Sequence, residues 1–507
     1  MRQAWDVATI RAAEGRLMGD LPEGTLMQRA ASGLASVCAQ LLNGSGGQVY
    51  GSRIVVLVGR GDNGGDALFA GARLAGRGAR VDAVLVSDQA HEGGLAALHR
   101  AGGWVHPLEE RDSPLGLIAS ADLVVDGIVG IGGTGSLREP AATYARVADE
   151  SDALVVSVDL PSGVDADTGE VAGEAITADV TVTFGALKPG LLVTPGHEHV
   201  GVLTVVDIGL NEVLSTGAAD GPALTILDAA DVASLLPHAT PGDHKYSRGV
   251  VGIVAGSTQM PGAAMLCTAG ARVAGIGMVR LYDRNAVVSA DVVAKYPDIV
   301  LDSTDPVESS RVNAWIGGPG LGRGQAERAL VRRLLDVETP LVLDADALFH
   351  LGTGVPGSGE LRDALRSRAV RGLVTVTTPH EGEFARLVGA AGTDRVESVR
   401  AAAGELGVIM LLKGSTTIIA TPEGDAYVNT VAVPELATAG SGDVLSGLIG
   451  GLLASGQGRA PGVLATAAAY LHGLAGSRLA EGGRAFTAEN LSDAIADAMA
   501  DLTVAAR

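Results

Sequence analysis

Residues 53–66 of the chain read Arg53-Ile54-Val55-Val56-Leu57-Val58-Gly59-Arg60-Gly61-Asp62-Asn63-Gly64-Gly65-Asp66. The apolar run predicts a strand at Arg53–Val58, the glycines predict a tight turn, and the Ala- and Leu-rich residues after Asp66 predict a helix. A short, continuous apolar run is typical of a parallel strand that helices cover on both faces. We therefore expect an α/β domain around this segment.

The same unit, an apolar run followed by an Ala-rich helical segment, recurs along the chain. We expect further strands at Ala79–Val86, Asp122–Asp126, Ala153–Asp159, Asp179–Phe184, Gly249–Ala255, Gly277–Tyr282, Val312–Gly317, Pro340–Asp344, Leu373–Thr378, Val408–Leu412 and Thr416–Ala420. Between Gly209 and Leu227 the pattern gives way to small polar residues, Gly and Pro, as at a domain joint. We therefore predict two α/β domains, residues 1–220 and residues 221–507, of which the second is larger.

The composition limits the partners that the chain can have. Its 507 residues carry 37 Lys and Arg against 58 Asp and Glu, and the net charge of −21 repels nucleic acid and acidic lipid. No apolar run approaches the roughly 20 residues of a membrane helix. Cys38 and Cys267 are the only cysteines, which fits a reducing compartment. We expect a cytoplasmic homo-oligomer with small-molecule ligands and neither a nucleic-acid nor a membrane partner.

Polar residues follow three of the predicted strands in the first domain. Gly59, Gly61 and Gly64 match G-x-G-x-x-G between a strand and a helix, so backbone N–H groups there can face a phosphate, although a tight turn alone also needs glycine. Asp126 and Asp159 end two further strands. Because ligands of parallel α/β sheets bind beyond the carboxyl ends of the strands, we expect these three loops to form one crevice. Taken alone, Asp126 could instead cap its loop.

The second domain has its strongest signal at Gly440-Ser441-Gly442-Asp443, where a glycine-rich turn leads into an apolar helix. The N–H groups and the helix dipole can hold an anion, while Asp443 faces a hydroxyl; that pairing is what phosphoryl transfer needs. Asp344 and Asp346 end another strand, where magnesium could bind. Asp344 as a helix cap, His380 as a structural residue and the segment from Lys413 to Thr417 as a hairpin turn are the competing interpretations.

The first domain resembles the NAD(P)H-hydrate epimerase domain, also called the YjeF amino-terminal domain, from Met1 to about Leu210. The resemblance is carried by Asn63-Gly64-Gly65-Asp66, by Asp126 with Gly130–Gly135, and by Asp159-Leu160-Pro161-Ser162-Gly163. It implies a Rossmann-like α/β sandwich with potassium bound by Asn63, Asp126 and Ser162. The residues that it assigns to the hydrated cofactor are Asp62, Asn63, Gly64, Gly65, Asp66, Gly130, Ile131, Gly132, Gly133, Thr134, Gly135, Ser136 and Asp159. Asp62 and Ala67 depart from the family's usual Asn-Asn-Gly-Gly-Asp-Gly, and Asp62 adds negative charge beside an anionic ligand.

Epimerisation of a carbon that carries both a ring nitrogen and a hydroxyl requires proton transfer as the carbon–oxygen bond opens and closes. Asp159 is our first candidate for moving that proton. Lys188, in Gly185-Ala186-Leu187-Lys188-Pro189-Gly190, is the second candidate, with an exposed, solvated lysine as the alternative.

The second domain resembles the ADP-dependent NAD(P)H-hydrate dehydratases of the ribokinase-like superfamily, from about Ala223 to the end of the chain. Gly318-Pro319-Gly320-Leu321-Gly322, Asp344-Ala345-Asp346, Thr378-Pro379-His380, Lys413-Gly414-Ser415 and the turn before Asp443 carry the resemblance. It assigns Ala263, Gly320, His380 and Asp443 to the hydrated cofactor, and Lys413, Gly414, Ser415, Thr416, Thr417 and Gly442 to the nucleotide. The segment Val433-Pro434-Glu435-Leu436 and Phe349 depart from the family's usual residues.

Together the two resemblances imply a bifunctional repair enzyme. One domain would interconvert the R and S forms of NAD(P)H hydrate, and the other would dehydrate the S form with ADP and Mg²⁺, with Asp443 as the base. The nearest alternative is a ribokinase-like small-molecule kinase with an accessory Rossmann-like binding domain. A redox Rossmann enzyme, which would need a ribose-binding acid near Asp88, and a catalytically idle first domain that binds a protein or RNA are further alternatives.

Overall fold

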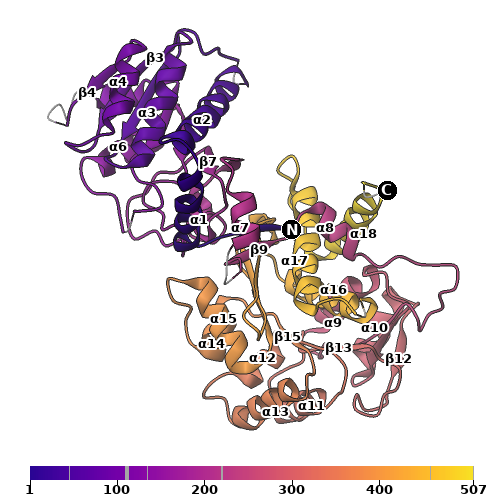
Figure 1. The fold of residues 1–507 in the computed structure, drawn as a ribbon. Helices are drawn as coiled ribbons and strands as arrows, with labels where there is room; N and C mark the ends of the chain where they lie inside the picture. The colour runs from indigo at the N-terminus through magenta and orange to yellow at the C-terminus, as the bar shows by residue number, and fades with distance from the viewer. Residues whose placement is uncertain (45, 109–113, 134, 218–220, 457, 506–507) are drawn as a thin grey trace. The chain divides into compact units, whose positions relative to one another are not determined.

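The computed structural model describes residues 1–44, 46–108, 114–133, 135–217, 221–456 and 458–505 (Figure 1). It divides into two compact units, one of Gln3–Leu224 and one of Thr225–Arg507 together with Met1–Arg2. The predicted boundary at residue 220 falls on residues 218–220, outside the described part of the chain. Among the described helices, none combines the length and the apolar character needed to cross a membrane.

The amino-terminal unit is built on a sheet whose strands run in the order β4-β3-β2-β5-β6-β7-β8, and each neighbouring pair is parallel. The strands are β2 (Arg53–Val58), β3 (Arg80–Leu85), β4 (Trp104–His106), β5 (Leu123–Gly127), β6 (Leu154–Val158), β7 (Val180–Phe184) and β8 (Val202–Val206). The helices are α1 (Val7–Asp20), α2 (Thr25–Gly44), α3 (Asp62–Ala75), α4 (Glu92–Arg100), α5 (Leu115–Ala119), α6 (Ala141–Asp149), α7 (Asn211–Gly217), η1 (Pro189–Leu191) and η2 (Gly196–His199).

Alternate residues of β2 belong to two separate hydrophobic cores. Val56 and Val58 pack with residues of α2 and α3, whereas Val55 and Leu57 pack with residues of α5 and α6. Side chains of a strand alternate between the faces of its sheet, so helices cover both faces. In Figure 1, α2 and α3 lie side by side. The predicted α/β sandwich is confirmed for this unit, with helices on each face of the sheet.

The sheet of the carboxyl-terminal unit has the order β9-β18-β17-β16-β15-β14-β13-β10-β11-β12. Its pairs are parallel from β12 to β16, and β17 runs antiparallel to both β16 and β18. The strands are β9 (Leu224–Ile226), β10 (Val250–Val254), β11 (Met278–Tyr282), β12 (Val300–Asp302), β13 (Ala314–Gly317), β14 (Leu341–Leu343), β15 (Thr375–Thr377), β16 (Ile409–Leu412), β17 (Thr417–Ala420) and β18 (Ala426–Asn429); the short β1 spans Arg2–Ala4.

Helices surround this second sheet, so the predicted α/β class is confirmed here too. They are α8 (Ala229–Leu235), α9 (Pro261–Val273), α10 (Ala286–Lys295), α11 (Gln325–Leu334), α12 (Asp346–Leu351), α13 (Ser358–Val370), α14 (Glu381–Val388), α15 (Arg395–Leu406), η3 (Pro434–Leu436), α16 (Ser441–Ser455), α17 (Pro461–Ala480) and α18 (Ala488–Ala505). The fully buried β10 and β13 are neighbours in the interior of the sheet and pack against α16.

Helices α9 and α16 pack backbone against backbone. A Cβ atom on Gly270 would overlap the carbonyl oxygen of Val444, and one on Gly447 would overlap that of Cys267. A Cβ atom on Gly451 would lie 2.9 Å from the carbonyl oxygen of Ala271. Only glycine permits so close an approach. Because Gly447 faces Cys267 and Gly451 faces Ala271, the two helices run in the same direction and begin at the same edge of the sheet.

Candidate active sites

The loops that follow β2 and β5 meet at the carboxyl edge of the amino-terminal sheet. A Cβ atom on Gly59 would overlap the carbonyl oxygen of Ile128, and one on Gly130 would lie 3.1 Å from Oδ1 of Asn63. The fold thus brings the predicted segments 62–66 and 130–133 together. Of the remaining predicted loop residues, Thr134 lies outside the described part of the chain, and Gly135 has a φ of 74°.

Asp126, at the end of β5, is fully buried and accepts hydrogen bonds on both oxygens. Oδ1 accepts from the Ser162 hydroxyl at 2.6 Å and from the Ile128 N–H at 3.2 Å. Oδ2 accepts from the Ser157 hydroxyl and the Ser162 N–H, both at 2.9 Å. Burial raises the pKa of Asp126, and these bonds oppose that effect. Asp126 therefore organises the loop that contains Ser162, as a capping residue would.

The predicted potassium residues fit a hard cation in their donor chemistry. Asn63, Asp126 and Ser162 offer amide, carboxylate and hydroxyl oxygens. Within the described chain, no Lys or Arg forms an ion pair with Asp126, so its carboxylate lacks a counter-charge. The Nδ2 atom of Asn63 is buried without a hydrogen-bond partner. Clusters of three or more His, Cys, Asp or Glu suited to a metal are absent from the described residues, so a cation here would depend on neutral oxygens and this one carboxylate.

Asp159 and Lys188 form a buried ion pair beside these loops. The Lys188 side chain is 1% exposed, which contradicts the solvated alternative. Its ammonium donates to Oδ1 of Asp159 and to Oγ1 of Thr183, the latter at 2.8 Å. The N–H of Phe184 also donates to Oδ1, at 3.2 Å. In the described structure all hydrogen bonds to this carboxylate go to Oδ1, which leaves Oδ2 for a ligand. Asp159 has a φ of 68°, a strained conformation of the kind found at functional sites.

Asp66 lies in the second turn of α3 and is 9% exposed. Its Oδ1 atom has no hydrogen-bond partner. Burial raises the pKa of Asp66 well above its ordinary value, and the negative charges of Asp159, Asp62 and Glu14 raise it further. Burial and these neighbouring charges thus shift Asp66 toward its protonated form.

In the carboxyl-terminal unit, Asp344 contacts both the segment that begins at Lys413 and helix α16, which follows the glycine-rich turn. It is 1% exposed, its Oδ1 atom lies 3.0 Å from the Lys413 ammonium, and its Oδ2 atom accepts a hydrogen bond from the Ser446 hydroxyl. A Cβ atom on Gly442 would lie 3.1 Å from the Lys413 ammonium. The first turn of α16 and the β16–β17 turn therefore meet at Asp344. Asp344 does not cap α12, whose N-cap is Ala345.

Asp443 lies in the first turn of α16. Burial, followed by the negative charge of Asp344, raises the pKa of Asp443 to about 7, and the Lys413 ammonium opposes this shift. Burial lowers the pKa of Lys413, but Asp344 and Glu383 more than offset that effect, so Lys413 stays cationic. A carboxylate with a pKa near the working pH is suited to general base catalysis.

Hydrogen bonds to residues before the helix and in helix α17 hold the N-terminus of α16 in place. Its N-cap, Gly440, has a φ of 90°, and the Ser441 hydroxyl donates to the carbonyl oxygen of Leu436 at 2.7 Å. Nε2 of His472 lies 3.0 Å from the carbonyl oxygen of Ser441, and burial lowers the pKa of His472 to about 4, so this ring is neutral and donates. The N–H of Ser441 donates to the carbonyl oxygen of Thr438 at 3.3 Å, whereas the next N–H groups, of Gly442 and Asp443, have no acceptor within the helix and can bind an anion.

The remaining predicted residues lie on the neighbouring loops. A Cβ atom on Gly320 would lie 2.7 Å from Cβ of Ala263, which brings these two together at the start of α9. His380 caps α14: its Nδ1 accepts from the Gly382 N–H at 3.0 Å, and it forms a backbone bridge with Lys413. The predicted segment 413–417 is the hairpin turn between β16 and β17 and the first residue of β17. His380 therefore has a structural role as a helix cap, and residues 413–417 form a hairpin turn, as the competing interpretations stated. Both lie at the edge of the sheet where Asp443 lies.

Asp346 is also held by the protein. Its Oδ1 atom lies 2.8 Å from Nε of Arg323, and Oδ2 accepts from the Gly322 N–H at 2.9 Å. With Asp344 bound by Lys413 and Ser446, neither carboxylate is available as a ready-made magnesium ligand. A magnesium ion would enter with the nucleotide phosphates, as is usual for this cation.

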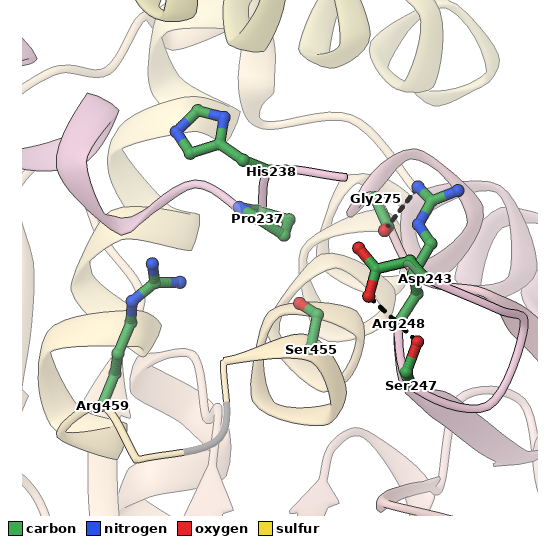
Figure 2. Close-up of a pocket in the computed structure, with 8 residues that line it drawn as sticks. All are labelled: Pro237, His238, Asp243, Ser247, Arg248, Gly275, Ser455 and Arg459. Carbon is green, nitrogen blue, oxygen red and sulfur yellow. Dashed lines mark hydrogen bonds between the residues drawn. The ribbon is translucent and has the colours of Figure 1, made fainter. Parts of the chain in front are cut away.

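A polar pocket of about 260 Å³ lies away from these residues (Figure 2). Arg248 and Arg459 stand on opposite sides of it and donate to the carbonyl oxygens of Gly275 and Leu235, each at 2.8 Å. These carbonyls are at the ends of α9 and α8, where cations stabilise helices. Since Gly275 precedes β11, the pocket is at the amino edge of the sheet, opposite to Asp443. Its arginines therefore stabilise helix ends and do not belong to the candidate active site.

Comparison with known proteins identifies the family. Two family models match, YjeF-related protein N-terminus over residues 23–190 and NAD(P)H-hydrate dehydratase over residues 251–497. The bifunctional NAD(P)H-hydrate repair enzyme Nnr of Mycobacterium tuberculosis is 45% identical over 463 residues, which are 90% of each chain. The chain belongs to the family of bifunctional NAD(P)H-hydrate repair enzymes. Both resemblances stated from the sequence are thereby confirmed.

A further relative and a solved structure are similar to the chain as well. The Nnr protein of Moorella thermoacetica is 37% identical over 481 residues, 88% of this chain and 87% of the relative. The crystal structure of ADP/ATP-dependent NAD(P)H-hydrate dehydratase from Bacillus subtilis, co-crystallised with ATP and Mg²⁺, aligns with 26% identity and a TM-score of 0.48 over 56% of this chain and 100% of that chain.

Three residues near the two candidate sites of this repair-enzyme family member were not predicted from the sequence. Ser446 and His472 support Asp344 and the start of α16, and Glu14 of α1 lies near Asp159. Each had a signal in the sequence. His472 is a polar residue within an Ala-rich apolar helix, and Glu14 interrupts the apolar face formed by Ile10, Ala13 and Leu17.

Proposed function

We propose that the chain repairs hydrated nicotinamide cofactors in two steps. Residues 1–220 interconvert the R and S forms of NAD(P)H hydrate, and residues 221–507 dehydrate the S form with ADP, which gives NAD(P)H, AMP and phosphate. Family membership supports the pairing of activities, and the single observation that carries the dehydratase step is Asp443, with a pKa of about 7, in the first turn of α16. A cytoplasmic homo-oligomer with small-molecule ligands is part of the proposal.

The dehydratase step overcomes a poor leaving group. Asp443 accepts the proton of the hydrate's hydroxyl as its oxygen attacks the terminal phosphorus of ADP, and AMP leaves. The ring nitrogen then donates its electron pair as the carbon–oxygen bond breaks and phosphate departs, and the adjacent ring carbon loses a proton to restore the dihydronicotinamide. In-line attack requires the hydroxyl to be held in one orientation, so only one epimer reacts.

The chain's own residues supply the electrostatic support for this transfer. The N–H groups of Gly442 and Asp443, in the first turn of α16, would donate to the phosphate, and the Lys413 ammonium would balance its charge. Ala263, Gly320 and His380 would contact the hydrate, and residues 413–417 with Gly442 the nucleotide. Magnesium, bound by the phosphates, would neutralise further negative charge.

The epimerase step needs a proton donor and acceptor beside the hydroxyl. Protonation of the departing oxygen releases water and leaves a cationic ring; water then adds to the other face and returns the proton. Asp159 is suited to move this proton through its Oδ2 atom, while its Oδ1 atom accepts a hydrogen bond from the Lys188 ammonium. The loops at residues 62–66 and 130–136 would bind the cofactor, and potassium held by Asn63, Asp126 and Ser162 would offset the buried negative charge of Asp126.

One experiment tests the dehydratase assignment. The full chain is incubated with NAD(P)H hydrate, ADP and Mg²⁺, and dihydronicotinamide absorbance, AMP and phosphate are followed together. Recovery of the absorbance with equal amounts of AMP and phosphate supports the proposal. Accumulation of a stable phosphate ester without recovered absorbance would instead identify a small-molecule kinase.

A further inference from the structure

Helix α1 contributes two charged residues to the neighbourhood of the candidate epimerase site, Arg11 and Glu14. They are three positions apart, so they lie on one side of the helix. The matched segment of the YjeF-related family begins at residue 23, after α1 has ended at Asp20. No motif discussed above includes either residue.

The start of α1 is fixed next to the Lys188 loop. The N–H of Trp5 donates to the carbonyl oxygen of Leu187 at 2.9 Å, and the N–H of Val7 donates to Oδ1 of Asp167 at 2.8 Å. Asp6 caps the helix by accepting from the N–H of Thr9 at 2.7 Å. The residue before Lys188 is therefore hydrogen-bonded to the chain just ahead of α1, which sets where the next turns of the helix lie.

Glu14 is a half-buried carboxylate that faces the buried ion pair. The charged groups that act on it are Asp159, Lys188 and Asp62, together with Arg11 of its own helix. It acts in turn on Asp66, whose buried Oδ1 atom lacks a partner. Burial raises the pKa of Glu14, and the negative charge of Asp159 adds to the effect. In the described part of the chain no Lys or Arg lies within ion-pair distance of Glu14. Its negative charge is therefore not neutralised by a single partner and acts on Asp159, Lys188 and Asp66.

Arg11 lies against the second glycine loop. Its Nη2 atom would be 3.1 Å from a Cβ atom on Gly132, which belongs to the loop predicted to bind the cofactor. That cofactor carries a negatively charged diphosphate, and Asp62 adds a carboxylate where the family commonly has Asn. The Arg11 guanidinium supplies positive charge for the diphosphate and offsets the negative charge that Asp62 adds.

We propose that α1 completes the epimerase site, with Arg11 as a binding residue for the diphosphate of the hydrate and Glu14 as a positioning residue that acts through Lys188 and Asp159. The inference rests on the proposed epimerase function. When Asp159 takes up a proton, the buried Lys188 ammonium loses its partner's negative charge, which is costly in a buried environment. Glu14 supplies a remaining negative charge nearby and keeps Lys188 charged and in place.

The test compares variants of the full chain in one assay of R and S epimer exchange, followed by chromatography. Arg11→Ala should raise KM about tenfold and leave kcat within about twofold, as expected for loss of one charged contact. Glu14→Gln should lower kcat about tenfold at unchanged KM and move the acidic limb of the pH profile, and Glu14→Asp should restore most of the rate. Arg16→Ala, on a different side of α1, is the control and should match the parent.

The outcomes separate the inference from the function beneath it. If the parent chain does not exchange the epimers, the epimerase assignment itself is wrong. If the parent exchanges them and both Arg11→Ala and Glu14→Gln match it in kcat and KM, the inference is wrong. A slow Glu14→Gln that has a lowered melting temperature and is not rescued by Glu14→Asp would show a merely structural role and would also overturn it. Dehydration of purified S hydrate by each variant reports that the rest of the chain is intact.

Discussion

The Lys413 ammonium lies 3.0 Å from Oδ1 of Asp344, and this pair stands beside the carboxylate of Asp443. The two members act on Asp443 in opposite directions, because Asp344 raises its pKa and Lys413 lowers it. Burial raises the pKa of the proposed base most, and this neighbouring pair, in which the Ser446 hydroxyl donates a hydrogen bond to Asp344, adjusts it further.

Asp344→Asn should therefore move the acidic limb of the dehydratase pH–rate profile to lower pH. Removal of the neighbouring negative charge lowers the pKa of Asp443 from about 7, by about one unit for a partly screened pair of like charges. The measurement is kcat at saturating S hydrate and ADP across pH. A limb at the parent's position would show that Asp344 does not control this base.

Asp443→Asn should abolish dehydration and leave nucleotide binding nearly unchanged. The amide cannot accept the hydroxyl proton, whereas the N–H groups of the first turn of α16 remain in place. Calorimetric titration with ADP and Mg²⁺ measures binding, and recovery of dihydronicotinamide absorbance measures turnover. Turnover at the parent rate would rule out Asp443 as the base.

The same substitution should stabilise the protein at higher pH. Because the pKa of Asp443 is about 7 in the folded state against 3.8 as the ordinary value, the native state binds more protons between these values and loses stability as pH rises through them. The gain from Asp443→Asn should be absent near about pH 4 and reach at most about 4 kcal/mol near about pH 8. Urea unfolding across pH measures it. Exposed Asp363→Asn is the control and should show no such growth.

Asp159→Asn should stop epimer exchange and leave dehydration of S hydrate intact. Asparagine tolerates the positive φ of 68° at this position, so the backbone is preserved while the proton acceptor is lost. The buried Lys188 loses its counter-charge, so we also expect the amino-terminal unit to lose about 3 kcal/mol of stability. Chromatography of the epimers and a thermal melt are the measurements. A variant that still exchanges the epimers would exclude Asp159 from the chemistry.

Gly270→Ala should impair dehydration and lower the melting temperature. A Cβ atom there meets the carbonyl oxygen of Val444, one residue after Asp443, so α16 must shift. We expect a cost of about 2 kcal/mol or more and a loss of kcat. Gly404→Ala in α15, where nothing lies within 4 Å of the new Cβ atom, is the matched control and should stabilise by up to about 1 kcal/mol. Equal effects of the two changes would contradict the packing argument.

The strands that are buried on both faces were predicted from the sequence, and the candidate site residues lie at or just beyond the carboxyl ends of these strands. The sequence did not predict β8 (Val202–Val206), an edge strand whose first residue is 66% exposed although the strand is as apolar as the buried β7. Lys188 illustrates the limit for the sites. Its type and loop context were compatible with a solvated side chain, and only tertiary packing shows that it is buried against Asp159. Glu14 was missed because α1 is distant in sequence from the glycine loops.

The direct backbone contact between α9 and α16 has a consequence for redesign of the dehydratase. Ala263 lies in the first turn of one of these helices and Asp443 in the first turn of the other, and the spacing of the helices is set by main-chain contacts at Gly270 and Gly447. Repacking of apolar side chains elsewhere cannot alter the distance between the two ligands that these residues are proposed to hold. A variant with a new phosphate donor would therefore have to be obtained by changing the loops, with this helical frame left as it is.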